Sequence, residues 1–313
     1  MTDYRSTERH PFTSLILLLV LIVVGAVVFI LFALIIGIAL YGLNPIIDIL
    51  LGKASGATNF LKIFQICTSI GMFVVPPLVF ARLEKRDWLG YLKLSNPTPI
   101  ILAVITIVLM FASAPLLEYS IILNRAMKFP SFLRGMENWM QQKEEEMAKL
   151  TMQLLVMKSA GVVAVNLIML AVIPAIGEEL TFRACLQKLL GKMTGNHHVA
   201  IWLAAIIFSA IHVQFYGFIP RMLLGALFGY LFFWSKSIWL PILAHFVNNA
   251  TAVITALVYQ RKGISMDKLD EGSPSPAYIY LISFVATAAL IWFFYNLATK
   301  NLLNKNPDGE RLE

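Results

Sequence analysis

Long apolar stretches separated by short charged segments dominate the sequence. A transmembrane helix needs about 20 predominantly apolar residues. By this measure the chain contains about eight candidate spans: 13–42, 60–81, 98–122, 157–187, 198–213, 217–234, 238–258 and 277–298. The fifth is short, and Pro174 in the fourth removes one backbone hydrogen bond and predicts a kink there. The pattern predicts an all-α, polytopic transmembrane helical bundle, with no internal repeat and no separate soluble domain.

The composition supports a lipid environment. Of the 313 residues, 58% are hydrophobic and 14% are charged, and the mean hydropathy is +0.75. Soluble domains carry about 25% charged residues, so lipid must solvate much of this surface. The formal net charge is +7, but most Lys and Arg residues lie in short segments between apolar runs, where they direct topology and contact headgroups. Membrane lipids are therefore expected partners, and nucleic acid is not.

The charges between the spans also predict an orientation. Lys and Arg are in slight excess on the side that holds both termini. Half of those on the other side lie in the longer segment 123–156, which is also rich in Glu. We therefore expect an integral protein of a bacterial inner (cytoplasmic) membrane with both termini in the cytoplasm. The first apolar run is too long for a signal-peptide core, so we interpret it as a retained span.

Two segments differ from the short connections. The charged stretch 131–149 has apolar residues at helical spacing, and either lies in the membrane interface as an amphipathic helix or extends the fourth span into water. The stretch 262–276 is rich in Gly, Ser and Pro and is typical of a loop. We accordingly divide the chain into three parts: N-terminal helices with the amphipathic or extended segment (1–150), a core (151–260), and a loop, last span and tail (261–313).

Three polar clusters interrupt the fourth, fifth and seventh spans. Charged groups inside a membrane cost several kcal/mol and usually face a protein interior or water. The clusters are Glu178, Glu179 and Arg183; Phe208 and His212; and His245, Asn248 and Asn249. At a rise of 1.5 Å per residue, their polar groups lie about 10 to 21 Å from the cytoplasmic edge. Three clusters at similar depth predict one shared site.

Each cluster also has an interpretation without chemistry. The cluster of Glu178, Glu179 and Arg183 could be a charge cluster in the headgroup region, and His212 could be an interfacial residue. The cluster around His245 could join helices by hydrogen bonds. Within the first cluster, Glu179 and Arg183 are four residues apart and can pair on one face of a helix. Glu178 is rotated by about 100° from its neighbour and points elsewhere. Cys67 and Cys185 lie in apolar stretches and are expected to be buried small residues rather than metal ligands or disulfide partners.

The residue types suit amide hydrolysis by activated water. A glutamate in an apolar cavity, paired with a neutral histidine, could hold and deprotonate water, as Glu178 and His212 would. His245 and Asn249 could donate hydrogen bonds to a developing oxyanion. One Glu and two His could instead form a Zn²⁺ site with an open water position, and the residue pattern leaves both alternatives open. Ser209 has no surrounding nucleophile turn, so its hydroxyl is expected to bond the backbone of its own helix.

In their order and spacing, the three motifs resemble the CAAX protease and bacteriocin-processing family of intramembrane endopeptidases, which includes the type II CAAX prenyl endopeptidases. The resemblance covers about residues 155–258. It implies that Glu178 and His212 activate the attacking water and that His245 and Asn249 bind the oxyanion. Family members are described as metalloproteases, and a metal-independent, glutamate-based mechanism is also argued for them.

Four neighbouring residues are expected to support this site: Glu179, Arg183, Phe208 and Asn248. The resemblance assigns the first two to organising the cavity. If a metal is bound, the expected ion is Zn²⁺ and its candidate ligands are Glu178, His212 and His245.

The expected function is therefore an intramembrane endopeptidase acting on a membrane-associated peptide or protein. A non-enzymatic immunity or scaffold protein that binds a partner through the same cavity is the alternative. A proton-coupled transporter is a third hypothesis, opposed by the lack of an inverted repeat or paired broken helices.

Overall fold

The computed structural model describes residues 9–50, 57–127, 129–264 and 274–305. These ranges are almost entirely helical and contain no β-strand. The predicted all-α class is therefore confirmed.

Seven helical stretches in the described ranges are long and apolar enough to cross a membrane. They are Pro11–Tyr41, Thr58–Glu84, Ile100–Ala126, Ala160–Thr194, Phe215–Ser235, Trp239–Arg261 and Ala277–Lys300. Each coincides with a predicted span. The remaining predicted span, 198–213, is a shorter apolar helix, α11 (His197–Ala210). The chain is an integral membrane protein.

The chain divides into two compact units. Unit 1 comprises Met1–Ser95 and Ile176–Ala204, and unit 2 comprises Asn96–Ala175 and Ala205–Glu313. Two helical stretches, Ala160–Thr194 and α11, therefore begin in one unit and end in the other.

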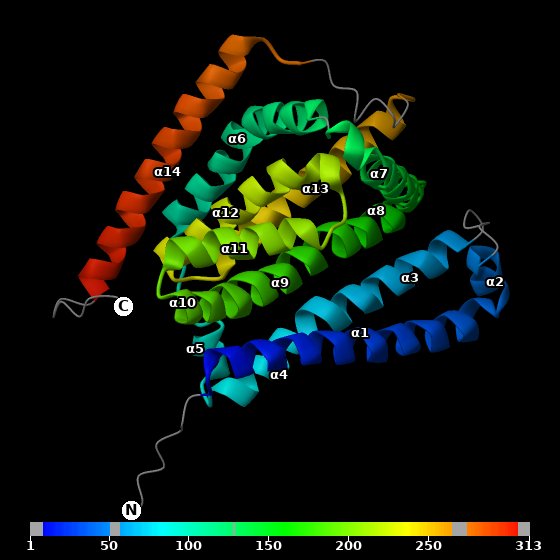
Figure 1. The fold of residues 1–313 in the computed structure, drawn as a ribbon, viewed down its shortest axis with the longest axis horizontal. Coiled ribbons are helices and arrows are strands. Elements are labelled where there is room, and N and C mark those ends of the chain that lie inside the picture. Colours follow the sequence, from blue (N-terminus) through cyan, green and yellow to red (C-terminus); the bar gives the residue numbers. More distant parts are fainter. Residues whose placement is uncertain (1–8, 51–56, 128, 265–273, 306–313) are drawn as a thin grey trace, which may run out of the picture. The chain divides into compact units, whose positions relative to one another are not determined.

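Unit 1 is built around α1 (Pro11–Tyr41), which runs beside α3 (Figure 1). Pro11 at the first position and the imidazole of His10, which accepts from the Phe12 N–H, start the helix. A Cβ placed on Gly25 would lie 2.1 Å from the Gly71 carbonyl oxygen, so glycine permits this close helix contact. The other elements of unit 1 are α2 (Asn44–Leu50), α3 (Thr58–Ser69), the π-helical η2 (Ile70–Val74), α4 (Val75–Glu84), α5 (Trp88–Tyr91), the π-helical η5 (Leu180–Gln187) and α10 (Lys188–Thr194).

Unit 2 contains most of the remaining helices. They are α6 (Ile100–Ala126), η3 (Ser131–Leu133), α7 (Arg134–Leu154), α8 (Ala160–Leu167), the π-helical η4 (Ile168–Val172), η6 (Phe215–Gly217), α12 (Phe218–Ser235), α13 (Trp239–Arg261) and α14 (Ala277–Lys305). The unit boundary falls within α9 (Ile173–Glu179).

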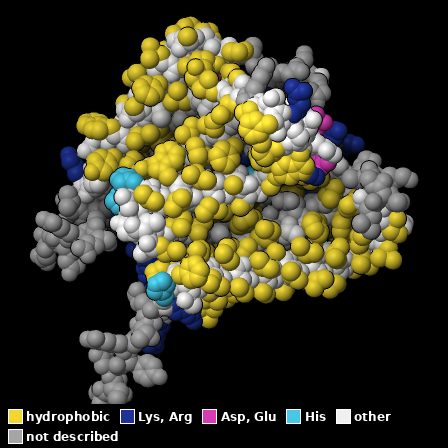
Figure 2. Space-filling model, viewed as in Figure 1, with side chains coloured by type: hydrophobic (Ala, Val, Ile, Leu, Met, Phe, Trp, Pro, Cys, Tyr) yellow, Lys and Arg dark blue, Asp and Glu magenta, His cyan; other side chains and the backbone are white. Residues whose placement is uncertain are grey.

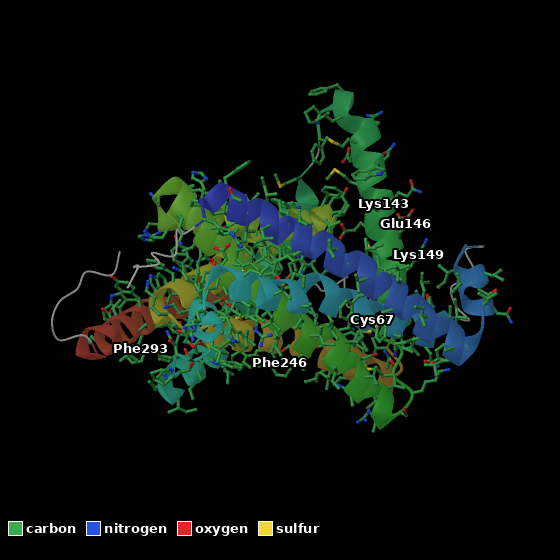
Figure 3. The ribbon with its side chains drawn as sticks, turned by 90° about the horizontal axis from the view of Figure 1, so that it is seen from below. Cys67, Lys143, Glu146, Lys149, Phe246 and Phe293 are labelled. Carbon is green, nitrogen blue, oxygen red and sulfur yellow. The ribbon has the colours of Figure 1, made fainter. Side chains whose placement is uncertain are left out.

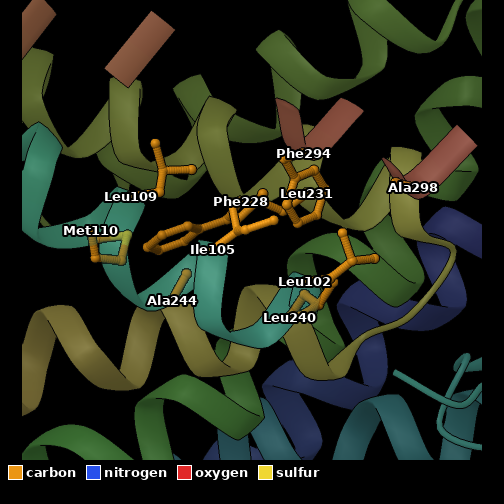
Figure 4. Close-up of a cluster of buried hydrophobic side chains, with 10 residues drawn as sticks. All are labelled: Leu102, Ile105, Leu109, Met110, Phe228, Leu231, Leu240, Ala244, Phe294 and Ala298. Carbon is orange, nitrogen blue, oxygen red and sulfur yellow. The ribbon is translucent and has the colours of Figure 1, made fainter. Parts of the chain in front are cut away.

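The core of unit 2 forms where α6, α12, α13 and α14 meet. Figure 4 shows its buried apolar side chains, among them Leu109, Phe228 and Ala244. The helix α14 lies along α6 (Figure 1), and the Ser283 hydroxyl donates to the Ala112 carbonyl at 2.6 Å. Ala244 of α13 lies in this core and directly precedes His245. The core therefore fixes α13 next to a predicted site residue.

The helix α7 is separate from the fourth span. It ends at Leu154, and α8 begins only at Ala160, so the interpretation of 131–149 as an extension of the fourth span is wrong. The amide of Gln260 holds the connection: its Oε1 accepts from the Met157 N–H at 2.9 Å and its Nε2 donates to the Leu155 carbonyl at 2.7 Å. The chain therefore turns between two distinct helices.

Charged side chains concentrate on α7, while apolar side chains cover most of the described surface seen in Figure 2. Lys143, Glu146 and Lys149 are labelled on α7 in Figure 3. The Lys143 ammonium donates to Glu146 at 2.6 Å and lowers the pKa of that carboxyl. On α1 and α14, by contrast, large apolar side chains such as Ile35 and Trp292 are about two-thirds exposed, at 66% and 67%. These helices present surfaces suited to lipid.

Candidate active site

The structure describes all eight predicted site residues, and they fall into two groups. Unit 1 holds Glu178, Glu179 and Arg183 on the fourth span. Unit 2 holds the predicted histidines and asparagines together with Phe208.

The first group contains a buried ion pair. The Nε of Arg183 lies 2.8 Å from Oε2 of Glu179, and both side chains are fully buried. The predicted pairing is therefore confirmed, although the helix widens into the π-helical η5 directly after Glu179. Glu178 is half-buried on the same turn. One of the two adjacent carboxylates thus neutralises the arginine.

The turn that carries these glutamates packs tightly on η2. A Cβ on Gly177 would lie 2.9 Å from the Cβ of Phe73, so any side chain there would push the two helices apart. One turn later, the Thr181 hydroxyl donates to the Phe73 carbonyl at 3.0 Å. The rings of Phe182 and Phe73 lie 6.3 Å apart. Phe73 is therefore the anchor point of this turn within unit 1.

In the second group, His212 lies in a turn rather than on a helix. The helix α11 ends at Ala210, and Val213 adopts a left-handed conformation with φ of 52°. The predicted span 198–213 would place Phe208 and His212 on one continuous helix, and this is wrong because the helix ends before His212. The two residues are nevertheless in contact: Nδ1 of His212 lies 2.7 Å from the Phe208 carbonyl oxygen, and the rings lie 5.0 Å apart.

This contact determines which histidine nitrogen carries the proton. A carbonyl oxygen can only accept, so Nδ1 of His212 is the donor. In the neutral ring, Nε2 then has an available lone pair and can accept a proton. The contact with Phe208 therefore leaves Nε2 as the His212 nitrogen that can accept a hydrogen bond.

His245 is buried among aromatic rings, with 5% of its surface exposed. Its ring stacks on Phe228 at 5.4 Å and meets Phe208 edge-on at 6.1 Å. The Phe208 ring therefore contacts both predicted histidines.

Asn249 lies one turn after His245 and bonds the fourth span. Its Nδ2 donates to the Leu170 carbonyl at 3.0 Å, and its Oδ1 accepts from Nδ2 of Asn248 at 3.1 Å. Leu170 is four residues before Pro174, which has no N–H to donate to that carbonyl. The irregularity predicted at Pro174 takes the form of the π-helical η4, and Asn249 satisfies a carbonyl that the proline releases.

The other predictions for single residues have mixed outcomes. The Ser209 hydroxyl donates to the Phe218 carbonyl at 2.7 Å, so it bonds the backbone of α12 and not that of its own helix. Cys67 and Cys185 are buried and form no disulfide with each other, as expected. Lys158 lies in the connection before α8, so its predicted position inside the span 157–187 is wrong.

The described residues contain no group of three or more His, Cys, Asp and Glu side chains that could hold a metal ion. The Zn²⁺ set of Glu178, His212 and His245 stays a prediction.

A cavity of about 340 Å³ lies in unit 2 beside the loop that follows His212. Its lining is mainly apolar and includes Met140 of α7 and Phe215 of η6. Asn124 closes one side: its Nδ2 donates to the Phe215 carbonyl at 2.9 Å, and its Oδ1 accepts from the Ile219 N–H at 2.7 Å. One asparagine thus holds both ends of this loop segment.

Sequence reasoning missed the residues that anchor the site, namely Phe73, Thr181, Phe228 and Leu170. Two of them had a usable signal. Pro77 and Pro174 each release the carbonyl four residues earlier, at Phe73 and Leu170, and such a carbonyl inside a membrane requires a polar partner from a neighbouring helix.

Comparison with known proteins gives an independent result. A family model described as Type II CAAX prenyl endopeptidase Rce1-like matches residues 160–251, which contain all three motifs. The uncharacterized protein YpbD of Bacillus subtilis (strain 168) is 28% identical over 110 residues, 34% of this chain and 52% of that protein. The chain thus spans about half the length of the curated relative it matches. No solved structure matches it significantly. The family resemblance predicted from the motifs is confirmed over the matched segment.

Proposed function

Because residues 160–251 match the Rce1-like family of type II CAAX prenyl endopeptidases, we propose that this protein is an intramembrane endopeptidase. It hydrolyses a peptide bond in a membrane-associated peptide or protein. Glu178 and His212 activate the water, and His245 and Asn249 stabilise the oxyanion.

The observation that carries this proposal is the contact between His212 and the Phe208 carbonyl at 2.7 Å. Because the carbonyl requires a proton on Nδ1, the Nε2 lone pair of His212 is available to accept a hydrogen bond from water. The Glu178 carboxylate is the partner that the family motif supplies.

The oxyanion role rests on the surroundings of α13. His245 is buried between aromatic rings, where hydrogen bonds to a developing charge are stronger than in water. The amide orientation of Asn249 is fixed, because its oxygen accepts from Asn248 and its nitrogen donates to Leu170. An amide nitrogen has two N–H groups, so Asn249 has a second one to donate to substrate.

The reaction balances with these groups alone. A water molecule that donates a hydrogen bond to Nε2 of His212 attacks the scissile carbonyl carbon as the Glu178 carboxylate takes its other proton. The carbonyl oxygen becomes an oxyanion that accepts hydrogen bonds from His245 and Asn249. Glu178 then donates its proton to the amide nitrogen as the C–N bond breaks. The new carboxylic acid loses its proton to Nε2 of His212 and then to solvent, which leaves a carboxylate and an amine.

The buried pair of Glu179 with Arg183 shapes the turn without taking part in proton transfer. We also propose that the protein lies in a bacterial inner membrane, with both termini in the cytoplasm and its apolar surface in contact with lipids.

The experiment compares purified wild type with Glu178→Ala on a library of short membrane-associated peptides. New peptide termini are identified by mass spectrometry, with and without a chelator. Termini found only with wild type support the proposal, and termini found equally with a well-folded Glu178→Ala contradict it. If wild type binds peptides but produces no new termini, the protein binds a partner without cutting it, as an immunity or scaffold protein would.

A further inference from the structure

The fourth span is anchored to η2 through a carbonyl that a proline has released. Pro77 has no N–H, so the Phe73 carbonyl, four residues earlier, lacks the donor of a continuous α-helix. The Thr181 hydroxyl donates to that carbonyl at 3.0 Å, and Thr181 has only 2% of its surface exposed. All of these residues belong to unit 1.

The geometry of this anchor constrains the neighbouring glutamate. Gly177 and Thr181 are one turn apart and both face Phe73. The backbone of Gly177 packs directly against Phe73, and the hydroxyl of Thr181 donates to the Phe73 carbonyl. Glu178 directly follows Gly177, so a helix held at both points cannot rotate at Glu178 without breaking one of them.

We propose that Thr181 is a positioning residue: its hydrogen bond to the proline-released carbonyl of Phe73 fixes the direction of Glu178. This inference rests on the proposed function for its catalytic consequence. Within a membrane no water replaces a lost hydroxyl, so removing it leaves the carbonyl without this partner and releases the turn. Catalytic groups must be held within about 0.5 Å of their productive positions.

The same arrangement occurs a second time in unit 2. Pro174 releases the Leu170 carbonyl, and Asn249 of α13 donates to it at 3.0 Å. The fourth span is therefore bonded at Leu170, eight residues before Glu178, and at Thr181, three residues after it. In both bonds, a side chain of one helix donates to a carbonyl of another helix that a proline has left without its usual donor. The hydrogen bond of Thr181 is therefore one of two such contacts on the fourth span.

The test uses Thr181→Val, which keeps the shape and removes the hydroxyl, and Thr181→Ser, which keeps the hydroxyl. We expect kcat for peptide cleavage to fall about 10- to 100-fold in Thr181→Val, with KM within about twofold. Thr181→Ser should retain kcat within about threefold. Introducing Pro77→Ala into Thr181→Val should recover part of the loss, because this substitution supplies an N–H to the Phe73 carbonyl. Thr106→Val is the matched control, since buried Thr106 bonds a carbonyl of its own helix at 2.7 Å.

A second readout does not depend on activity. A nitroxide label at Glu178→Cys, in a chain whose Cys67 and Cys185 are replaced by alanine, reports the mobility of the turn. Its spectrum should sharpen in Thr181→Val and stay unchanged in Thr181→Ser and Thr106→Val. An unchanged spectrum in Thr181→Val, or equal losses of kcat in Thr181→Val and Thr181→Ser, overturns the inference. If the wild type cleaves nothing but the spectrum changes as expected, the proposed function fails while the anchor stands.

Discussion

The ion pair of Glu179 and Arg183 makes a quantitative prediction about stability. Both side chains are fully buried and their charged atoms lie 2.8 Å apart. Removing one partner of such a pair leaves an uncompensated buried charge and costs about 3 to 5 kcal/mol. We therefore expect Glu179→Leu and Arg183→Met each to lower the free energy of unfolding by about this amount.

The double variant separates this cause from simple loss of packing. Replacing both partners by apolar residues of similar size removes the charge problem entirely, so it is often neutral or stabilising. The double variant should cost no more than the worse single variant, which gives a coupling energy of at least about 3 kcal/mol. Additive single effects would mean that the charges do not stabilise each other.

The assay is an unfolding titration with sodium dodecyl sulfate in mixed micelles, followed by tryptophan fluorescence and circular dichroism. Either of two results would refute the reasoning: single variants that match wild-type stability, or a double variant whose loss equals the sum of the single losses. The second result would mean that Glu179 and Arg183 contribute to stability through packing and not through their ion pair.

Three other predictions concern separate parts of the molecule. Asn124→Leu removes both hydrogen bonds to the Phe215–Ile219 segment and should lower the free energy of unfolding by about 2 to 3 kcal/mol in the same titration. A variant as stable as wild type would show that these two hydrogen bonds do not stabilise the segment. Lys143→Met should raise the pKa of Glu146 toward its usual value, because Lys143 lowers it; an unchanged carboxyl NMR titration would show that the pair does not persist in solution. Because a lowered carboxyl pKa stabilises the folded state only above it, any contribution of this pair should disappear as the pH falls through that pKa. Peptide cleavage should persist after chelation and dialysis if side chains alone activate the water, and a loss restored by Zn²⁺ would contradict that mechanism.

The transmembrane fold was largely predictable because length and apolarity determine what can cross a bilayer. The described spans coincide with predicted ones, and the shortest predicted span is the one that falls below spanning length. The break before Ala160 and the end of α11 at Ala210 could not be read from the pattern. The connection before Ala160 is bonded by the side chain of Gln260, which is distant in the chain.

The site was predictable where its contacts are local. The pair of Glu179 with Arg183 follows from a spacing of four residues, and so does the contact of Phe208 with His212, although a turn replaces the expected helix. To predict the contact of Asn249 with Leu170, one must know how the two helices are aligned along their axes. The spacing of residues within one helix does not give that alignment. Prolines offered a partial signal, since they identify which carbonyls are released but not which side chain binds them.

In the proposed function, Glu178 acts as a base rather than as part of a binding surface. The most direct test is Glu178→Gln, which preserves shape but cannot take a proton, reconstituted in liposomes with one cleaved peptide. We predict that its turnover falls by about 10² to 10⁴ while the Kd for the peptide stays within about threefold of wild type. Turnover within about tenfold of wild type, with unchanged Kd, would contradict the account and remove Glu178 from the chemistry.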